Sequence, residues 1–111
     1  MFSNCELIEN IDLSKLNTSS VTSLIRMCYG FKWLKLVNLS NFKTSNVENL
    51  SFMFYGCGSL KSNDLSSFDT SNVMFTGYMF SKCVNLNSMN FLNFNVTKIK
   101  SFRGCLKIVK L

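Results

Sequence analysis

The sequence predicts an α/β fold, a leucine-rich-repeat solenoid with a parallel β-sheet on one face and short helices on the other. The first observation is a fixed period: the segments MFSNC, MCYGF, MFYGC and MFSKC begin at residues 1, 27, 53 and 79. The second is an L-x-x-L-x-L spacing within each copy, as in Leu34, Val37 and Leu39. A period of roughly 20–29 residues with this spacing is typical of stacked repeats that share one core.

The repeats account for the whole chain as one domain, residues 1–111. Their expected bounds are 1–26, 27–52, 53–78 and 79–100, followed by a partial copy over 101–111. Because the chain starts and stops inside a repeat, we expect it to be an excerpt of a longer array. A composition of 47% hydrophobic and 16% charged residues is that of a globular chain, which excludes a disordered one. No apolar run approaches the ~18 residues of a membrane span.

Three apolar columns predict the strands, because equivalent residues of stacked coils lie side by side. The columns are Ile8, Leu34, Leu60, Leu86; Ile11, Val37, Asn63, Met89; and Leu13, Leu39, Leu65, Phe91. Successive coils at one strand spacing form a parallel sheet with these side chains directed inward. Asn63 is the polar exception, and we expect the core to be weakest there.

Two further columns follow each strand. Leu16, Phe42, Phe68 and Phe94 predict an inward aromatic stack, while Thr18, Thr44 and Thr70 supply hydroxyls for the loop backbone. Beyond them, Val47, Leu50 and Phe54 fall at i, i+3 and i+7, and Ser45 with Glu48 has capping-box spacing. This pattern predicts a short helix that begins at Asn46 and ends at Gly56.

The net charge of +6 lies entirely in residues 70–111, which carry six cations and no acid. One interpretation is a patch for an anionic polymer or nucleic acid, formed by Lys98, Lys100, Arg103, Lys107 and Lys110. The favoured alternative is a solvated end of the stack. Nucleic-acid binding is disfavoured because no aromatic platform is interleaved with these cations.

The chemistry-bearing residues predict neither catalysis nor a cofactor. Histidine is absent, and the five cysteines contain no C-x-x-C pair, so no zinc site and no catalytic constellation can be assembled. Buried free thiols are favoured over a Cys83–Cys105 disulfide, because equivalent side chains of adjacent coils run parallel. We therefore expect a protein that is not an enzyme and holds no metal.

Two polar columns on the strands are the candidate ligand-facing positions. They consist of Asp12, Asn38, Asp64 and Asn90, and of Glu9, Lys35, Lys61 and Asn87. A ladder of polar groups at strand spacing is a typical binding surface of repeat proteins. Their mixed signs are equally those of ordinary solvated positions, and this second interpretation is favoured.

Two long segments carry a family resemblance: LSNFKTSNVENLSFMFYGCGSL and DLSSFDTSNVMFTGYMFSKCVNL. They resemble the 26-residue repeat of BspA-like leucine-rich-repeat surface proteins, a repeat of bacterial lipoproteins and cell-wall proteins. The resemblance implies a non-catalytic adhesion scaffold, on the cell surface or secreted, that contacts a protein or extracellular-matrix ligand. These 111 residues contain no signal peptide or anchor motif, so a non-exported structural spacer or repeat remnant stays open.

The partners expected besides a ligand are neighbouring repeats of a longer chain and other copies of this one. Glu6 and Glu9 lie in the first coil, whereas Lys107 and Lys110 lie in the last. Opposite charges at the two ends favour head-to-tail contact between copies. We therefore predict end-to-end self-association that weakens as the salt concentration rises.

Overall fold

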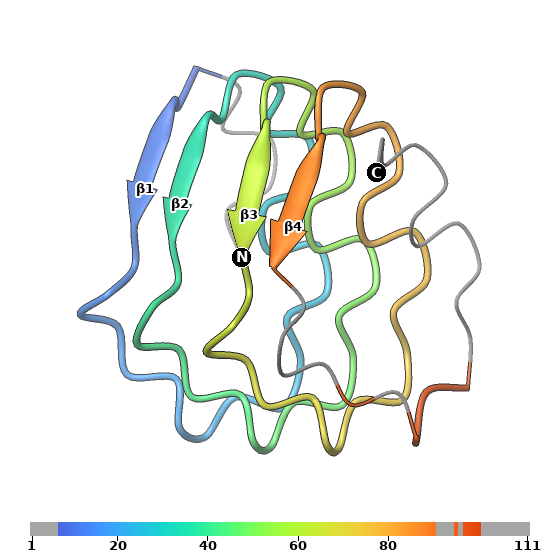
Figure 1. The fold of residues 1–111 in the computed structure, drawn as a ribbon. Coiled ribbons are helices and arrows are strands. Elements are labelled where there is room, and N and C mark those ends of the chain that lie inside the picture. The colour runs from blue at the N-terminus through green and yellow to red at the C-terminus, as the bar shows by residue number, and fades with distance from the viewer. Residues whose placement is uncertain (1–6, 91–94, 96, 101–111) are drawn as a thin grey trace.

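A computed structural model of the chain describes residues 7–90, 95 and 97–100, and these wind into a stack of coils (Figure 1). Each fully described coil contributes one short strand to the same side of the stack. The strands are β1 (Asn10–Asp12), β2 (Leu36–Asn38), β3 (Ser62–Asp64) and β4 (Ser88–Asn90). The pairs β1–β2 and β3–β4 are both parallel, and equivalent repeat positions face each other in both.

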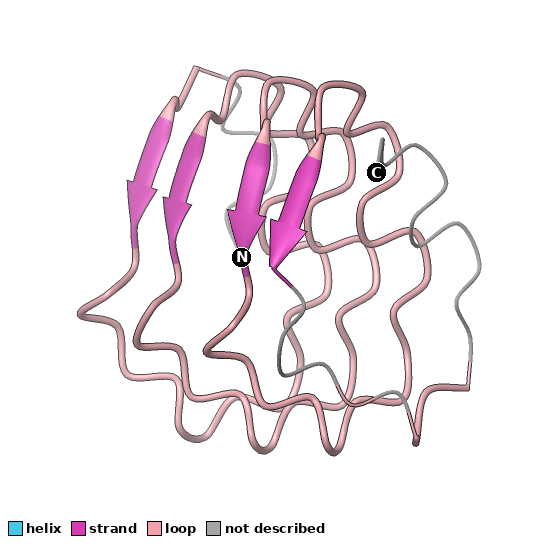
Figure 2. Cartoon of the chain, viewed as in Figure 1, coloured by secondary structure: helices cyan, strands magenta, loops and turns pink. Residues whose placement is uncertain are grey.

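The prediction of an α/β leucine-rich-repeat solenoid is wrong, because the described residues contain no helix (Figure 2). The segments predicted to be helical, including the one from Asn46 to Gly56, fold as consecutive tight turns. Glu48 does not cap a helix; its backbone N–H donates to the carbonyl of Thr22 at 2.8 Å, in the preceding coil. The side opposite the strands is therefore built of turns.

The reason lies in how the turn segments use their backbone donors. The N–H groups of alternate residues donate to carbonyls of the following coil, at 2.8–3.1 Å: Leu24 to Asn49, Arg26 to Ser51, Cys28 to Met53 and Gly30 to Tyr55. Between them, the N–H groups of Met27 and Tyr29 bond to the carbonyl three residues back, and that of Ile25 bonds to the Ser23 hydroxyl. An α-helix needs every N–H to reach the carbonyl four residues back, so this alternation excludes one.

Left-handed backbone at one repeat position also interrupts any helix. Arg26, Phe52 and Tyr78 have φ of 56°, 59° and 58°. A right-handed helix cannot pass through a residue in that region, and a bulky side chain there is strained. Because these residues hold the same place in successive repeats, the strain recurs from coil to coil and is balanced by the same inter-coil hydrogen bonds.

A second line of parallel pairing crosses the coils away from the strands. Ser23 forms a β-bridge with Asn49, and Asn49 forms one with Phe75. The coils are thus bonded to one another both along the strand side and along this line. Figure 1 shows successive coils running alongside each other on the side away from the strands.

A threonine ladder satisfies the loop backbone, as the sequence predicted. Thr44 Oγ1 accepts a hydrogen bond from the Asp69 N–H at 2.8 Å and donates one to the Asp69 carbonyl at 3.1 Å. Thr18 binds Lys43 in the same way, and Thr70 binds Asn95. All three threonines are buried. Each threonine hydroxyl thereby satisfies one backbone N–H and one backbone carbonyl of the following coil, which would otherwise lack these hydrogen bonds.

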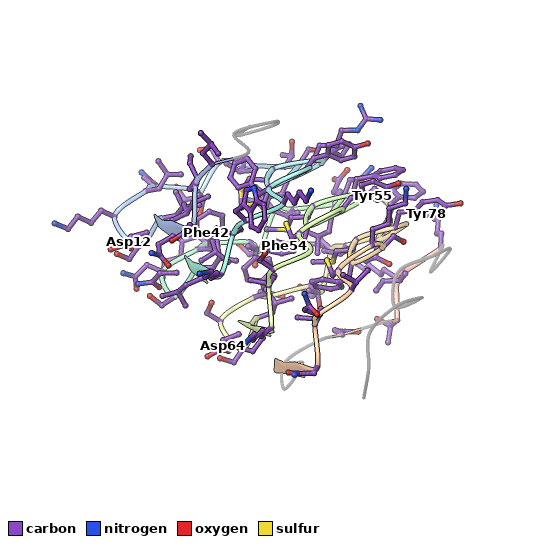
Figure 3. The ribbon with its side chains drawn as sticks, turned by 90° about the horizontal axis from the view of Figure 1, so that it is seen from above. Asp12, Phe42, Phe54, Tyr55, Asp64 and Tyr78 are labelled. Carbon is purple, nitrogen blue, oxygen red and sulfur yellow. The ribbon has the colours of Figure 1, made fainter. Side chains whose placement is uncertain are left out.

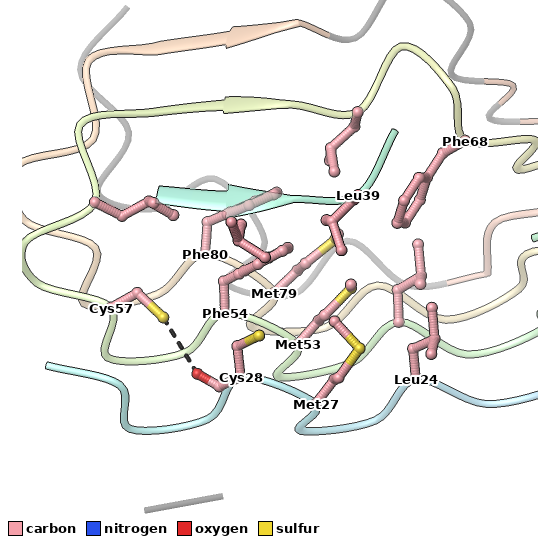
Figure 4. Packing of buried hydrophobic residues seen from close by; sticks show 14 of the residues in the cluster. Leu24, Met27, Cys28, Leu39, Met53, Phe54, Cys57, Phe68, Met79 and Phe80 are labelled. Atoms are coloured by element: carbon pink, nitrogen blue, oxygen red, sulfur yellow. Dashed lines mark hydrogen bonds between the residues drawn. The ribbon is translucent and has the colours of Figure 1, made fainter. Parts of the chain in front are cut away.

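The core runs through the centre of the stack as columns of like side chains (Figure 4). Leu34, Leu60 and Leu86 are fully buried, as expected of an inward column, whereas Ile8 of the same predicted column is 37% exposed. The Phe42 and Phe68 rings stack with centroids 6.2 Å apart, and the Phe54 and Phe80 rings stack at 5.5 Å. Leu16, predicted to join the first of these stacks, is instead 40% exposed, and Phe94 lies outside the described residues.

Two glycines of the third coil provide a test of the turn geometry. Gly56 has φ of 77°, where any side chain is strained, although a Cβ would have room beside Gly30. We expect Gly56→Ala to lower the free energy of unfolding by about 1–2 kcal/mol, measured by chemical denaturation.

The matched control is Gly58→Ala, because Gly58 lies outside the left-handed range and a Cβ there would make contacts no closer than 3.9 Å. Its unfolding free energy should stay within about 1 kcal/mol of the parent protein, on either side. Equal losses for the two variants would contradict the assigned turn conformation.

Candidate functional site

The predicted ligand-facing column of aspartates and asparagines lies in line on the strand side. Figure 3 shows Asp12 and Asp64 on this side of the molecule. Asp12, Asn38 and Asp64 are exposed, and the backbone of Asn90 occupies the equivalent place in β4. In each of the first three, Oδ1 accepts a hydrogen bond from the N–H two residues on, at 2.9–3.0 Å: Ser14, Ser40 and Ser66.

These bonds are Asx turns that end each strand, so the column has a structural task. Hydrogen bonds from Ser14, from its hydroxyl first and then its backbone N–H, hold the pKa of Asp12 below the ordinary value. Ser66 lowers the pKa of Asp64 in the same manner. A carboxylate that accepts such bonds stays ionised and is poorly suited to act as an acid or base near neutral pH.

The second predicted column brings Glu9 and Lys35 together. The Lys35 Nζ lies 3.8 Å from Glu9 Oε1, and both side chains are more than half exposed. An ion pair this exposed contributes little to stability. Lys61 and Asn87 occupy the equivalent positions of the next two coils and are also exposed. A groove of about 300 Å³ lies along this column, lined by Lys35, Ser59, Lys61 and Asn85.

A larger groove of about 620 Å³ lies where the strand side is divided. The strands β2 and β3 belong to separate two-stranded sheets, and no strand pairing joins them. The Ser67 hydroxyl bridges the two coils by donating to the Leu39 carbonyl at 3.1 Å. The side chains and backbone around the groove belong to Leu36, Val37, Asn38, Leu39, Ser40, Asp64, Ser66 and Ser67.

The division falls beside the residue expected to weaken the core. Asn63 belongs to β3, the strand that fails to pair with β2, while its own pairing with Met89 in β4 is kept. The side chain of Asn63 lies outside the described part of the structure, so the predicted cost of its amide stays a prediction. The structure shows that the strand side is interrupted between β2 and β3, next to Asn63.

The predicted basic patch is described only in part. Lys98 Nζ donates to Asn72 Oδ1 at 3.0 Å, in the preceding coil, and the Lys100 backbone N–H bonds to the Met74 carbonyl. Both residues are exposed. Arg103, Lys107 and Lys110 lie outside the described residues. The two described lysines therefore take part in joining the coils.

Opposite the strands lies a cluster of aromatic and cationic side chains that was not predicted from the sequence. Figure 3 shows Tyr55 and Tyr78 on the far side from Asp12 and Asp64. Tyr29 stacks on Tyr55 with centroids 4.9 Å apart, and Phe52 stacks on Tyr78 at 5.1 Å. The signal was present, because Tyr29 and Tyr55 share one repeat position while Phe52 and Tyr78 share another.

Two cations complete this cluster. The Arg26 guanidinium lies 5.4–5.6 Å from the Phe52 and Tyr29 ring centroids, and Lys82 Nζ lies 5.6 Å from that of Tyr55. Ring faces that stack on one another or carry a cation are not free to stack on a ligand. These contacts join the turns of successive coils to one another.

The described cysteines are structural thiols. Cys28, Cys57 and Cys83 are free and fully buried, as predicted, whereas Cys105 of the alternative disulfide lies outside the described residues. Cys57 Sγ donates to the Cys28 carbonyl at 3.2 Å (Figure 4), and Cys83 Sγ donates to that of Phe54 at 3.0 Å. Burial raises the pKa of Cys28 and Cys83 to about 12, so neither is a nucleophile at neutral pH.

Residues 7–90, 95 and 97–100 offer no other chemical centre. They contain no group of three or more cysteine, aspartate, glutamate or histidine residues that could hold a metal ion. Nor does any helix within them have the length and apolarity to cross a membrane. Among the features with room for a ligand on the strand side are the two grooves, which are lined by both polar and apolar groups.

The Asx turns predict a specific acid response. Carboxylates whose pKa is lowered in the folded state stabilise it above their unfolded pKa, and this stabilisation is lost as the pH falls through the folded value. Asn38 makes the same bond without titrating. The double variant Asp12→Asn, Asp64→Asn should therefore unfold near the parent's temperature at about pH 7 and lose less stability than the parent at about pH 3.

The control is Glu48→Gln, which removes an exposed carboxylate outside the Asx turns. Thermal unfolding followed by circular dichroism at both pH values measures the three proteins. An acid loss in the double variant as large as the parent's would show that the turns do not depend on the ionised carboxylates.

Comparison with known proteins places the chain in a family. A family model described as "Mycoplasma protein of unknown function, DUF285" matches residues 1–110. No curated protein and no solved structure matches the chain. Because the family match covers the stack of coils from its first repeat to its last, it applies to the whole fold described above. The chain belongs to the DUF285 family of Mycoplasma proteins.

Proposed function

We propose that the chain is a non-catalytic binding scaffold that offers its strand side to a protein or extracellular-matrix ligand. The observation that carries the proposal is the surface around β2, where Leu36 is 62% exposed beside the larger groove. Leu36 adjoins Val37 and Leu39 in the lining of this groove, and contiguous exposed apolar surface rimmed by polar groups is typical of an interaction site. Stacked coils hold such groups at fixed spacing, which suits recognition of an extended surface.

The chemistry of the described residues supports binding over catalysis. Asp12 and Asp64 are held as ionised turn acceptors, and the thiols of Cys28 and Cys83 are held protonated in the core. A catalytic group needs a pKa matched to its task and a path to substrate. These four residues lack at least one of those two properties, and they serve the stack itself.

The resemblance to BspA-like surface repeats supports an adhesive role at the bacterial surface or after secretion. A non-exported spacer with a protein-interaction role is the alternative that this resemblance disfavours. Head-to-tail self-association stays a further prediction, although Glu9 already has Lys35 as a partner within its own chain. The described part of the predicted basic patch does not favour a nucleic acid as the ligand, since Lys98 is bonded to Asn72.

Binding to purified ligands tests the proposal, and Leu36→Ser is the variant of choice. Its side chain is largely exposed, so the fold should tolerate the change, whereas a ligand seated on the strand side should bind about tenfold more weakly. Biolayer interferometry against a panel of immobilised matrix proteins and serum glycoproteins measures the affinity.

The matched control is Ile25→Ser, because Ile25 is 41% exposed and lies among the turns near the second line of bridges. The proposal expects it to bind like the parent. Failure of the parent to bind any member of the panel, or equal weakening by both variants, would contradict a ligand on the strand side. Accessibility to protease on intact cells tests the surface location separately.

A further inference from the structure

Exposed apolar side chains gather at one corner of the coil, just before strands β1, β2 and β4. The described residues include eight exposed large hydrophobic side chains, and four belong to this corner: Leu7, Ile8, Trp33 and Val84. We call residues 7–9, 32–35, 58–61 and 84–87 the pre-strand edge. Trp33 is 46% exposed and Val84 is 48% exposed.

Backbone bonds hold the segments of the pre-strand edge in line. The Ser59 N–H donates to the Lys32 carbonyl at 3.1 Å, and the Asn87 N–H donates to that of Lys61 at 2.9 Å. Gly58 adds no side chain between the second and fourth coils, and a Cβ on it would lie 3.9 Å from both the Lys32 carbonyl oxygen and the Val84 Cγ2. These segments therefore form one ridge, which carries exposed apolar groups in the first, second and fourth coils.

The same ridge is basic. Lys32, Lys35 and Lys61 are exposed along it, whereas Glu9 is its single carboxylate among the described residues and already lies 3.8 Å from Lys35. The Lys32 ammonium lies 5.4 Å from the centroid of the Trp33 ring. The groove of about 300 Å³ opens between Lys35 and Lys61, with Ser59 and Asn85 as its other lining residues.

We propose that the pre-strand edge binds the surface of an anionic lipid bilayer. Lysines attract acidic headgroups, and aliphatic and indole side chains enter the boundary between headgroups and acyl chains. Tryptophan is the residue that favours this boundary most clearly. The groove between Lys35 and Lys61 offers a headgroup phosphate two cations and a hydroxyl.

The composition of the edge favours a membrane over a protein partner. Protein interfaces are depleted in lysine at their centre, yet here lysines alternate with the apolar groups along the ridge. Long lysine stems can lie along an apolar surface while the ammonium stays at the headgroups. The proposal adds a lipid surface to the scaffold's ligands and does not depend on the protein ligand proposed for the strand side.

The test uses Trp33 as its own probe, because it is the one tryptophan in the sequence. Mixed with vesicles of phosphatidylglycerol and phosphatidylcholine, the protein should show a blue shift of tryptophan emission and quenching by brominated acyl chains. Vesicles of phosphatidylcholine alone should produce neither effect, and high salt should reverse both, since the attraction is screened.

Paired lysine variants distinguish a defined edge from general adhesion of a cationic protein. Lys35→Gln with Lys61→Gln should weaken partitioning into the anionic vesicles about thirtyfold, as expected for two lysines near such a surface. The matched control is Lys15→Gln with Lys43→Gln, which removes the same charge from exposed positions at the other end of the strands. The control should weaken partitioning far less.

Three results would overturn the proposal. The first is an unshifted and unquenched Trp33 in the presence of the anionic vesicles. The second is equal weakening by both lysine pairs, which would show adhesion by net charge. The third is a blue shift with soluble heparin or an acidic protein that vesicles fail to reproduce, which would assign the edge to that partner. Loss of protein binding by Leu36→Ser would leave this test unaffected.

Discussion

Hydrogen bonding between successive coils is the constraint on which the rest of the structure depends. In the turn segment of each coil, alternate backbone N–H groups donate hydrogen bonds to carbonyls of the following coil, as Cys28 does to Met53 and Gly30 to Tyr55. The donors in between close tight turns within the coil. This arrangement fixes the register of the repeats, forces left-handed backbone at Arg26, Phe52 and Tyr78, and leaves no room for a helix.

Side chains complete what the backbone begins. Buried threonines fill the remaining loop bonds, cysteine thiols donate to carbonyls of the preceding coil, and Asx turns end the strands. In a stack of this kind each coil contacts only its neighbours, so every device must recur at the same place in each copy. Most of the polar side chains that the sequence marks as candidate ligand contacts, such as Asp12 and Asp64, therefore form hydrogen bonds within the chain. Binding then depends on exposed side chains that have no such structural role.

The period, the inward leucine column and the threonine ladder could all be predicted from the sequence, because repetition places equivalent residues side by side. The predicted helix from Asn46 to Gly56 was wrong, although the burial of its apolar residues was predicted correctly. Val47, Leu50 and Phe54 are fully buried as the apolar rhythm indicated. That rhythm arises here from tight turns linked across coils, and a spacing of i, i+3 and i+7 does not distinguish such turns from a helix.

Some of the candidate sites could likewise be predicted from the sequence, and others could not. The exposed strand columns were located correctly by period, but their hydrogen bonds to the serines two residues on depend on backbone angles that the period does not reveal. The aromatic cluster and the pre-strand edge were missed because each joins different residue types at neighbouring positions. Trp33, Ser59 and Asn85 share a column without sharing any chemistry, so only the arrangement of the corner shows them as one surface.

Scalar couplings across hydrogen bonds test the central claim most directly, because they identify the donor and the acceptor of each bond in solution. A labelled sample should show a coupling between the amide nitrogen of Cys28 and the carbonyl carbon of Met53, in the following coil. It should show none between that nitrogen and the carbonyl carbon of Leu24. A coupling to Leu24, four residues back, would be the mark of an α-helix and would contradict this account of the fold.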